Sequence, residues 1–413
     1  MIQLTNIPHC LAVALTLTSV FAEPVTPARL NELPPAEQPV WKAYLEKSKS
    51  GAAADHAALQ AEVAANNLPG AVRAPSGGDF KLSVEAGNAW YGGEEAGKLA
   101  DAILSYQTPS GGWSKHLGFS EGPRKPGMQW TSQNEPGQSA HYVATFDNSS
   151  TTAEMEYLAN VWLATKREDC KAAFIKGLNF ISAAQYPNGG WPQVYPLEGK
   201  YHDDIAFNDN AITNILVLLQ GIAGNEPSYA FLDETQRKQA ADAMTRGIDC
   251  LLKTQIVQDG RKTVWSAQFD PLTLQPSNAR KMEPATLSGL ESARTLKFLM
   301  SLTNPSPEIV ACIESGLTWF DEVKVTGMGT KEMDGKTVYV ADPASTEVRW
   351  ARFYDLKTSK PVFPGRDGVL YETFEAMAAK NKLGYDFYTS QPNSIVTNGQ
   401  KKWRKLLASQ TAK

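Results

Sequence analysis

Apolar side chains recur at helical spacing in three separate stretches of the chain. Residues three or four positions apart lie on one face of a helix, so each stretch predicts an amphipathic helix. The three apolar faces are formed by Ala96, Leu99 and Ile103, by Phe174, Leu178 and Ile181, and by Met244, Ile248 and Leu251.

A second helix is predicted after each of these three. Residues 147–152 and 208–210 are clusters of side chains that cap helix N-termini. The apolar positions that follow them are Met155, Leu158 and Trp162 in the first case, and Ile212, Ile215, Leu216 and Leu219 in the second. In the third stretch, Glu283-Pro284 is expected to open a helix through Leu287, Leu290 and Phe298, because proline is tolerated in a first helical turn.

A short glycine-containing motif separates the two helices of each pair. Residues 107–113 (QTPSGGW) recur as residues 185–191 (QYPNGGW), with five of seven positions identical, and residues 255–265 form a degraded third copy. The unit is therefore helix, turn and helix, repeated three times. Such pairs bury their apolar faces best by closing into an (α/α)3 toroid of inner and outer helices, which makes the fold class all-α; an open solenoid is the alternative.

The toroid is expected to span residues 81–413, after an N-terminal helical extension at residues 23–80. A small β-hairpin insert is predicted near 323–340, where Asp334-Gly335 forms a turn between alternating residues.

The chain begins with an apolar run, residues 10–22 (CLAVALTLTSVFA), that ends in a small-residue cleavage pattern. We interpret residues 1–22 as a signal peptide, which predicts export to the periplasm or secretion. No run is long enough to span a bilayer, so no membrane association is expected. The remaining cysteines, Cys170, Cys250 and Cys312, are expected to be buried apolar residues of helices.

The charge balance restricts the partners of the protein. The chain has 40 Lys and Arg against 44 Asp and Glu, a formal charge of −4, so it lacks the basic field that attracts nucleic acid. An anionic ligand must be held by local cations. Lys115, Arg280, Lys281 and Arg366 lie in or next to turns and form such a group. They suit a uronate chain, which carries one carboxylate per sugar, better than a neutral glycan.

The phase of the repeats places Asp147, Asp209 and the pair Arg280-Lys281 where a turn meets an inner helix, on one rim of the toroid. Two aspartates, each followed by asparagine, supply the hard oxygen ligands that calcium prefers. Two other interpretations stay open, that they are only helix caps or that they are the general acid and base of a glycoside hydrolase. Trp265 could line the cleft or belong to the core.

These segments resemble the pectate lyases of polysaccharide lyase family ten, over about residues 87–388. The resemblance is carried by Gly111–Lys115, Thr145–Asn148, Asn188–Gln193, Asn208–Ala211, Trp265–Arg294, Trp350–Tyr354 and Gly365–Gly368. It implies an (α/α)3 toroid that needs calcium and cleaves polygalacturonate by β-elimination, giving 4,5-unsaturated products.

The resemblance also implies roles for individual residues. Calcium would be bound by Asp147 and Asp209, and Arg280 would abstract the proton, with Lys281 as an alternative base. Substrate contacts would come from Arg366, Lys115 and Asn148. Lys281 and Trp265 are also predicted to contact substrate, from their places in the sequence. The protein is expected to act as a monomer on the polysaccharide. The alternatives are a hydrolase that uses Asp147 and Asp209, and a uronate-binding protein without catalysis.

Overall fold

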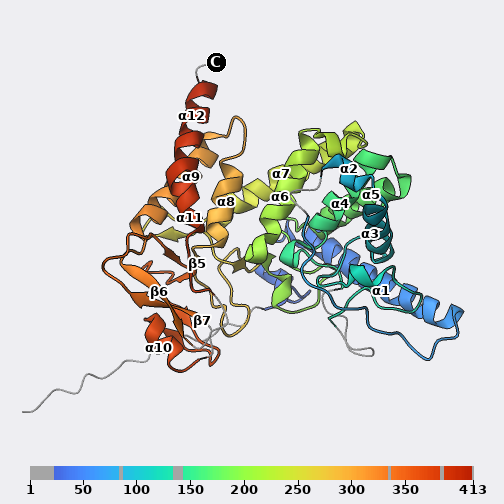
Figure 1. Ribbon diagram of the computed structural model, residues 1–413, viewed down its shortest axis with the longest axis horizontal. Coiled ribbons are helices and arrows are strands. Elements are labelled where there is room, and N and C mark those ends of the chain that lie inside the picture. The colour runs from blue at the N-terminus through green and yellow to red at the C-terminus, as the bar shows by residue number, and fades with distance from the viewer. Residues whose placement is uncertain (1–22, 83–86, 134–142, 334–335, 382–385, 412–413) are drawn as a thin grey trace, which may run out of the picture.

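Helices dominate the computed structural model, which describes residues 23–82, 87–133, 143–333, 336–381 and 386–411. The predicted signal peptide, residues 1–22, lies outside the described residues. The N-terminal helices lie on the right of Figure 1, the C-terminal helices and strands lie on the left, and α6 and α7 lie between them.

The helices form two layers, as the pattern predicts. The inner helices are α4 (Thr152–Thr165), α6 (Ala211–Ala223) and α8 (Glu291–Leu299). The outer helices are α3 (Glu94–Ser105), α5 (Glu168–Ala184), α7 (Glu234–Thr254) and α9 (Pro307–Glu322). Helix α6 contacts α4 and α8 in its own layer, and the outer helices contact one another in the order α3, α5, α7, α9. The prediction of an all-α toroid is confirmed.

Hydrogen bonds confirm all three copies of the repeat. The indole Nε1 of Trp113, Trp191 and Trp265 donates to a carbonyl of the preceding outer helix at 2.7, 2.9 and 2.8 Å, respectively. The amide Nε2 of the glutamine that opens each motif donates to a carbonyl of the next outer helix at 2.9, 2.9 and 3.0 Å. These glutamines are Gln107, Gln185 and Gln255, and their acceptors are Ala173, Ala243 and Cys312. Each turn therefore joins two consecutive outer helices.

The second turn needs glycine at position 189 for two reasons. Gly189 has φ +95°, a conformation that side chains disfavour, and a Cβ atom there would lie 2.0 Å from the carbonyl oxygen of Arg246. Gly260, in the third turn, also has a positive φ, +78°, but a Cβ atom there would meet nothing within 4 Å.

We expect Gly189→Ala to destabilise the protein by about 3–5 kcal/mol, since backbone strain and a backbone clash act together. Gly260→Ala is the matched control and should cost only about 1–2 kcal/mol, because it adds strain without a clash. Urea unfolding of both variants measures the difference. Equal losses of stability would contradict the role assigned to the Arg246 carbonyl.

The third inner helix begins later than the sequence indicates. Helix α8 starts at Glu291, whereas Glu283-Pro284 was expected to open it. Residues Leu287–Ser288 instead form strand β5, which pairs with β9 (Phe353–Tyr354) from the C-terminal part. The amide of Ser288 also donates to the Trp265 carbonyl at 2.8 Å. These tertiary hydrogen bonds keep the segment extended.

Short antiparallel strand pairs join the turns and the C-terminal region. The longest pair is the predicted hairpin, β6 (Met328–Met333) with β7 (Lys336–Ala341), whose turn residues 334–335 lie outside the described part. The others pair β1 (Ile205–Ala206) with β4 (Gln268–Phe269), β2 (Val257–Gln258) with β3 (Arg261–Lys262), β8 (Trp350–Ala351) with β12 (Tyr388–Thr389), and β10 (Phe363–Pro364) with β11 (Leu370–Tyr371). The remaining short helices are α2 (Asn88–Tyr91), α10 (Phe374–Ala378) and α11 (Gln391–Ser394), followed by α12 (Gln400–Thr411).

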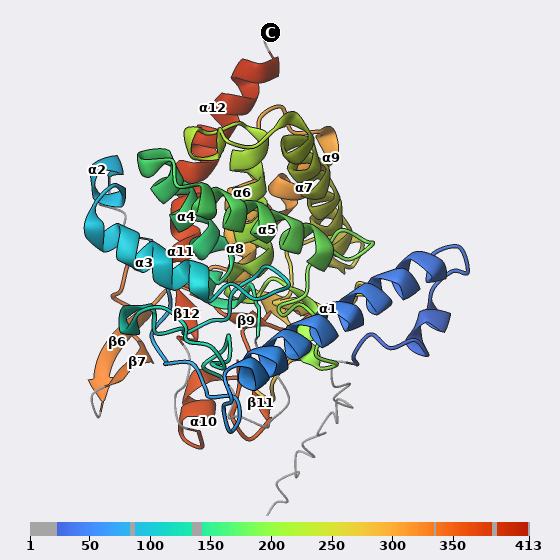
Figure 2. The ribbon, with the colours of Figure 1, turned by 90° about the vertical axis from the view of Figure 1, so that its right-hand side faces the viewer.

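The predicted N-terminal helical extension contains one long helix, α1 (Gln38–Ala65). In Figure 2 it crosses below α5. Tyr44 Oη donates to the Ala184 carbonyl at 2.9 Å, and Asp55 accepts hydrogen bonds from the amide and hydroxyl of Ser110 at 2.7 and 2.6 Å. Helix α1 thus contacts the first two repeats. The boundary at residue 80 stays a prediction.

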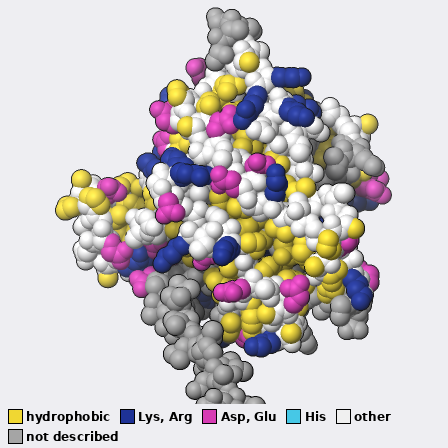
Figure 3. Space-filling view, turned by 90° about the vertical axis from the view of Figure 1, so that its left-hand side faces the viewer, with side chains coloured by type: hydrophobic (Ala, Val, Ile, Leu, Met, Phe, Trp, Pro, Cys, Tyr) yellow, Lys and Arg dark blue, Asp and Glu magenta, His cyan; other side chains and the backbone are white. Residues whose placement is uncertain are grey.

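Two further expectations concern the core and the surface. Cys170, Cys250 and Cys312 are buried, unbridged residues of α5, α7 and α9, as expected. In the described part of the chain, no helix has both the length and the apolar character of a membrane span. On the face drawn in Figure 3, Lys and Arg side chains form small separate groups between acidic and apolar ones.

Candidate active site

Two turns with unusual backbone conformation lie at the starts of α4 and α6. They are the 3₁₀ turns Asp147–Ser149 and Asn208–Asn210. Asn148 has φ 51° and Asp209 has φ 49°, values that few residues other than glycine adopt. When the two turns are aligned by these φ values, Asn148 corresponds to Asp209 and Asp147 corresponds to Asn208. This alignment differs by one residue from the one that places the two Asp-Asn sequences together. Such strained backbone is concentrated at functional sites.

The carboxyl groups of Asp147 and Asp209 lie within hydrogen-bonding range of each other, as the repeat phase predicts. Burial and the charge of Asp147 raise the pKa of Asp209 to about 7. Burial also acts to raise the pKa of Asp147, but the ammonium group of Lys115 and hydrogen bonds from neighbouring side chains together hold this pKa below its ordinary value. As the pH falls through neutrality, Asp209 is therefore protonated while Asp147 stays ionised.

Lys115 and Gln193 both lie beside Asp147. Lys115 Nζ is 2.5 Å from Asp147 Oδ2, and the Gln193 amide also favours the ionised form of Asp147. Each residue stands two positions after the tryptophan of its turn, so the first two repeats present them at equivalent places. Lys115 thus lies beside a predicted calcium ligand, its predicted contact with substrate stays a prediction, and Gln193 was missed.

Asp209 has neighbours from all three repeats. The Asn208 amide donates to Asp209 Oδ2 at 3.0 Å. Glu291, at the start of α8, raises the pKa of Asp209, and Arg352 lowers it. Arg352 Nη2 lies 3.5 Å from Glu291 Oε1, with both side chains nearly buried. The third repeat thus supplies a carboxylate and its paired cation behind the two aspartates.

We expect the metal-free protein to lose stability through Asp209 as the pH rises from about 4 to about 7. Unfolded Asp209 ionises near pH 4, whereas the folded state keeps its proton until the pH approaches 7. In EDTA, Asp209→Asn should be more stable than the parent by about 2–4 kcal/mol at pH 8 and similar to it at pH 4. Urea unfolding at both pH values measures this, and a pH-independent difference would contradict it.

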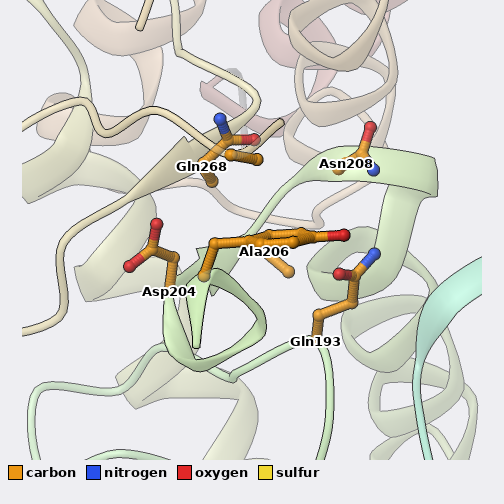
Figure 4. A pocket seen from close by; sticks show the side chains of 7 residues that line it. Gln193, Asp204, Ala206, Asn208 and Gln268 are labelled. Carbon is orange, nitrogen blue, oxygen red and sulfur yellow. The ribbon is translucent and has the colours of Figure 1, made fainter. Parts of the chain in front are cut away.

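A small polar pocket adjoins the carboxylate pair and has room for about one water molecule. In Figure 4 the amides of Gln193 and Asn208 lie on one side of it and the Asp204 carboxyl lies on the other. Its lining residues are Gln193, Tyr201, Asp204, Ala206, Asn208, Gln268 and Ala279. Burial raises the pKa of Asp204 well above its usual range, and Ser277 Oγ lies 2.6 Å from its Oδ2. The pocket joins the first two turns to the segment before Arg280.

Arg280 is paired with a glutamate that the sequence had suggested only as a helix start. Its Nε and Nη2 donate to the two carboxylate oxygens of Glu283 at 2.8 and 2.6 Å. The Arg280 side chain is 57% exposed, whereas Glu283 is 8% exposed. A buried carboxylate thus holds an accessible guanidinium at the rim and favours its charged form.

The turn that carries Arg366 lies against Lys281. A Cβ atom on Gly368 would lie 3.8 Å from Lys281 Cδ. Arg280, Lys281 and Arg366 are all exposed. Asn148 Nδ2 lies 3.1 Å from the His116 Nε2, which itself lies 2.8 Å from Asp79 Oδ1. Lys281 and Arg366 thus come from adjoining turns, and Asn148 contacts the first turn through His116.

Trp265 must be removed from the predicted substrate contacts. Its side chain is fully buried, and its indole donates to the Leu251 carbonyl at 2.8 Å. It occupies the same core position as Trp113 and Trp191. Its place in the repeat, rather than its polar neighbours in the sequence, decides its role.

The carboxylate pair fits a hard divalent cation. Asp147 Oδ1 is buried and has no hydrogen-bond donor at ordinary bonding distance among the described residues. Within those residues, no three side chains of His, Cys, Asp or Glu converge to enclose a metal. Asp147 and Asp209 could therefore supply hard oxygen ligands to such a cation, and its remaining ligands would have to come from water or substrate.

A helical toroid with paired carboxylates and accessible cations on one rim is the architecture of an α/α-toroid polysaccharide lyase. Residues 107–396 match the sequence model of the pectic acid lyase family. The chain therefore belongs to this family, polysaccharide lyase family 10, and it is an enzyme of the pectate lyase class. This finding removes the interpretation as a binding protein without catalysis.

Two solved structures support the assignment. The family 10 polysaccharide lyase from Cellvibrio cellulosa is 31% identical, over 76% of this chain and 94% of its own, with a TM-score of 0.66. An aspartate-to-alanine mutant of that lyase, in complex with trigalacturonic acid, is 31% identical over 78% of this chain and 99% of its own, also with a TM-score of 0.66. No sequence among the curated proteins matches the chain.

Proposed function

We propose that this protein is an exported, calcium-dependent pectate lyase that cleaves α-1,4-polygalacturonate by β-elimination. The observation that carries the proposal is the direct interaction of the Asp147 and Asp209 carboxyl groups, together with a buried Asp147 oxygen that has no hydrogen-bond donor among the described residues. The Cellvibrio relative that binds trigalacturonic acid supports a galacturonate substrate.

Asp147 and Asp209 would hold the calcium ion. When bound, calcium supplies positive charge that acidifies the proton next to a uronate carboxylate and stabilises the charge that develops there. Lys115 keeps Asp147 ionised and so prepares the pair for a cation. Arg366 and Lys281, whose turns lie together, would bind the substrate carboxylates, and Asn148 would contact a sugar hydroxyl.

Arg280 would accept the C5 proton of the uronate. The electron pair of the C5–H bond then forms the C4–C5 double bond, and the C4–O bond breaks to release the other sugar chain. An arginine paired with Glu283 is protonated, so this role requires the ion pair to open when substrate binds. Alkaline conditions favour the neutral guanidine, and Lys281 is the alternative base.

The contact between the aspartates argues against a glycoside hydrolase. Inverting hydrolases separate their two carboxyl groups by roughly 6.5–9.5 Å and retaining ones by about 5–5.5 Å. The direct interaction between the carboxyl groups of Asp147 and Asp209 does not fit two separated catalytic roles. A shared cation is the function that such proximity favours.

Turnover of polygalacturonate, followed by the ultraviolet absorbance of 4,5-unsaturated products, tests the proposal. We expect absorbance to rise with calcium and to stop with EDTA. New reducing ends without absorbance would indicate hydrolysis and overturn it. Cell fractionation tests export, for which the sequence of residues 1–22 is the support. Analytical ultracentrifugation tests the expected monomer.

A further inference from the structure

A second cleft opens in the C-terminal region, at one end of the β8–β12 pair. We call it the Arg349 cleft. It has a volume of about 350 Å³, within the range of about 300–1,000 Å³ that is common for small-ligand sites. Its lining residues are Thr346, Glu347, Val348, Arg349, Ser390 and Asn393.

Strand pairing fixes the two walls of this cleft. Trp350 pairs with Thr389, so Arg349, which precedes Trp350, lies beside Ser390, which follows Thr389. The backbone of Arg349 also exchanges hydrogen bonds of 2.8 and 2.9 Å with Val325. The cation is therefore held on a backbone that is anchored on both sides.

The hairpin insert orients the Arg349 side chain. Arg349 Cζ lies 5.4 Å from the centre of the Tyr339 ring, which belongs to β7. Tyr339 Oη donates to the Tyr388 carbonyl at 3.1 Å, so the ring is itself fixed to β12. A guanidinium over an aromatic face is held in place while its edge stays available to a planar anion.

The guanidinium is incompletely paired. Its Nη2 donates to Glu347, a side chain that is 61% exposed, while Arg349 is 16% exposed. Its Nε is buried and has no hydrogen-bond acceptor among the described residues. The exposed carboxylate of Glu347 thus uses only part of the Arg349 guanidinium. A guanidinium can bind a carboxylate through two parallel hydrogen bonds.

We propose that the Arg349 cleft is a second binding site for a galacturonate unit, separate from the carboxylate pair. The uronate carboxylate replaces Glu347 on Arg349, and the side chains of Thr346, Ser390 and Asn393 bind sugar hydroxyls. This inference rests on the proposed function only for the identity of the polysaccharide. Arg349 is three residues before Arg352, whose charge acts on Asp209, so at most about 11 Å of chain separates their Cα atoms.

The surface around the cleft makes this site testable. The chain is acidic overall, so general attraction of a polyanion is weak. Arg404 and Glu314 form an exposed ion pair outside the cleft, with side chains 54% and 40% exposed. Their alanine variants are matched controls for the loss of one positive or one negative charge.

Native electrophoresis in gels containing polygalacturonate or dextran, with EDTA present, measures binding without turnover. We expect Arg349→Ala to weaken binding to polygalacturonate by about three- to fivefold and Glu347→Ala to strengthen it by a similar factor, the size expected for an accessible ion pair. Arg349→Lys should recover only part of the loss. Arg404→Ala should weaken binding less than Arg349→Ala does, and Glu314→Ala should strengthen it less than Glu347→Ala does.

The proposal is overturned if Glu347→Ala binds no more tightly than Glu314→Ala, or if Arg349→Ala and Arg404→Ala bind equally. Because Glu347 is exposed, its variant tests the site even if Arg349→Ala fails to fold. Ultraviolet-monitored turnover of polygalacturonate by the parent, with calcium, tests the proposed function separately. Absence of turnover in the parent would refute the proposed function and leave the binding result valid.

Discussion

We expect Arg280→Ala to lower kcat on polygalacturonate by about 10²- to 10⁴-fold, the contribution of a positioned acid–base group. The guanidinium is accessible, and two hydrogen bonds to the buried carboxylate of Glu283 hold it at the rim until substrate binds. Removing it leaves the carboxylate pair intact, so calcium binding should change little. Ultraviolet turnover and calcium titration of the same variant separate the two effects.

Lys281→Ala is the matched control for this prediction, because it removes the neighbouring exposed cation. We expect it to raise KM and to leave kcat within about tenfold of the parent, since one solvated charge contributes little. If Lys281→Ala lowers kcat as strongly as Arg280→Ala is expected to, and Arg280→Ala does not, then Lys281 is the base.

Asp209→Ala should abolish calcium-dependent activity. Loss of a direct ligand should lower calcium affinity by more than the roughly 10- to 100-fold that supporting residues contribute. The effect is large because Asp147 alone, already paired with Lys115, offers little to a divalent ion. Isothermal titration calorimetry with calcium measures it directly.

Asp204→Asn is the control for the charge of a nearby buried acid. Burial raises the pKa of Asp204 well above its usual range, so this side chain is neutral, as asparagine is. The substitution should therefore leave calcium affinity within about threefold of the parent. If Asp204→Asn lowers calcium affinity as much as Asp209→Ala does, then the cation binds on the Asp204 side of the pocket, and the assigned site is wrong.

The helix pairs could be predicted from the sequence because helical periodicity and glycine turns are local properties. Phe174, Leu178 and Ile181 are buried on α5, and Ile212, Ile215 and Leu216 on α6, as their spacing indicates. The start of α8 could not be predicted, because strand β5 depends on pairing with Phe353–Tyr354, far along the chain. Local helical spacing at Leu287 and Leu290 gave way to this tertiary pairing.

The candidate site could be predicted only in part. The repeat phase brought Asp147 and Asp209 together correctly, because equivalent turns of a toroid lie on one rim. The repeat phase missed Glu283, because its contact with Arg280 depends on the local turn that the two residues share. It also missed Asn208, because the turns that carry Asp147 and Asp209 align with a shift of one residue. Gln193 could have been found, since it stands two residues after Trp191 as Lys115 does after Trp113.

The glutamine that opens each turn has a consequence for how the protein unfolds. Gln107, Gln185 and Gln255 each tie one outer helix to the next through a hydrogen bond in which the acceptor belongs to the following repeat. No helix pair can then open alone without leaving a polar group of its neighbour unsatisfied. The ring should therefore melt as a single cooperative unit, and an excised pair of helices should be poorly ordered.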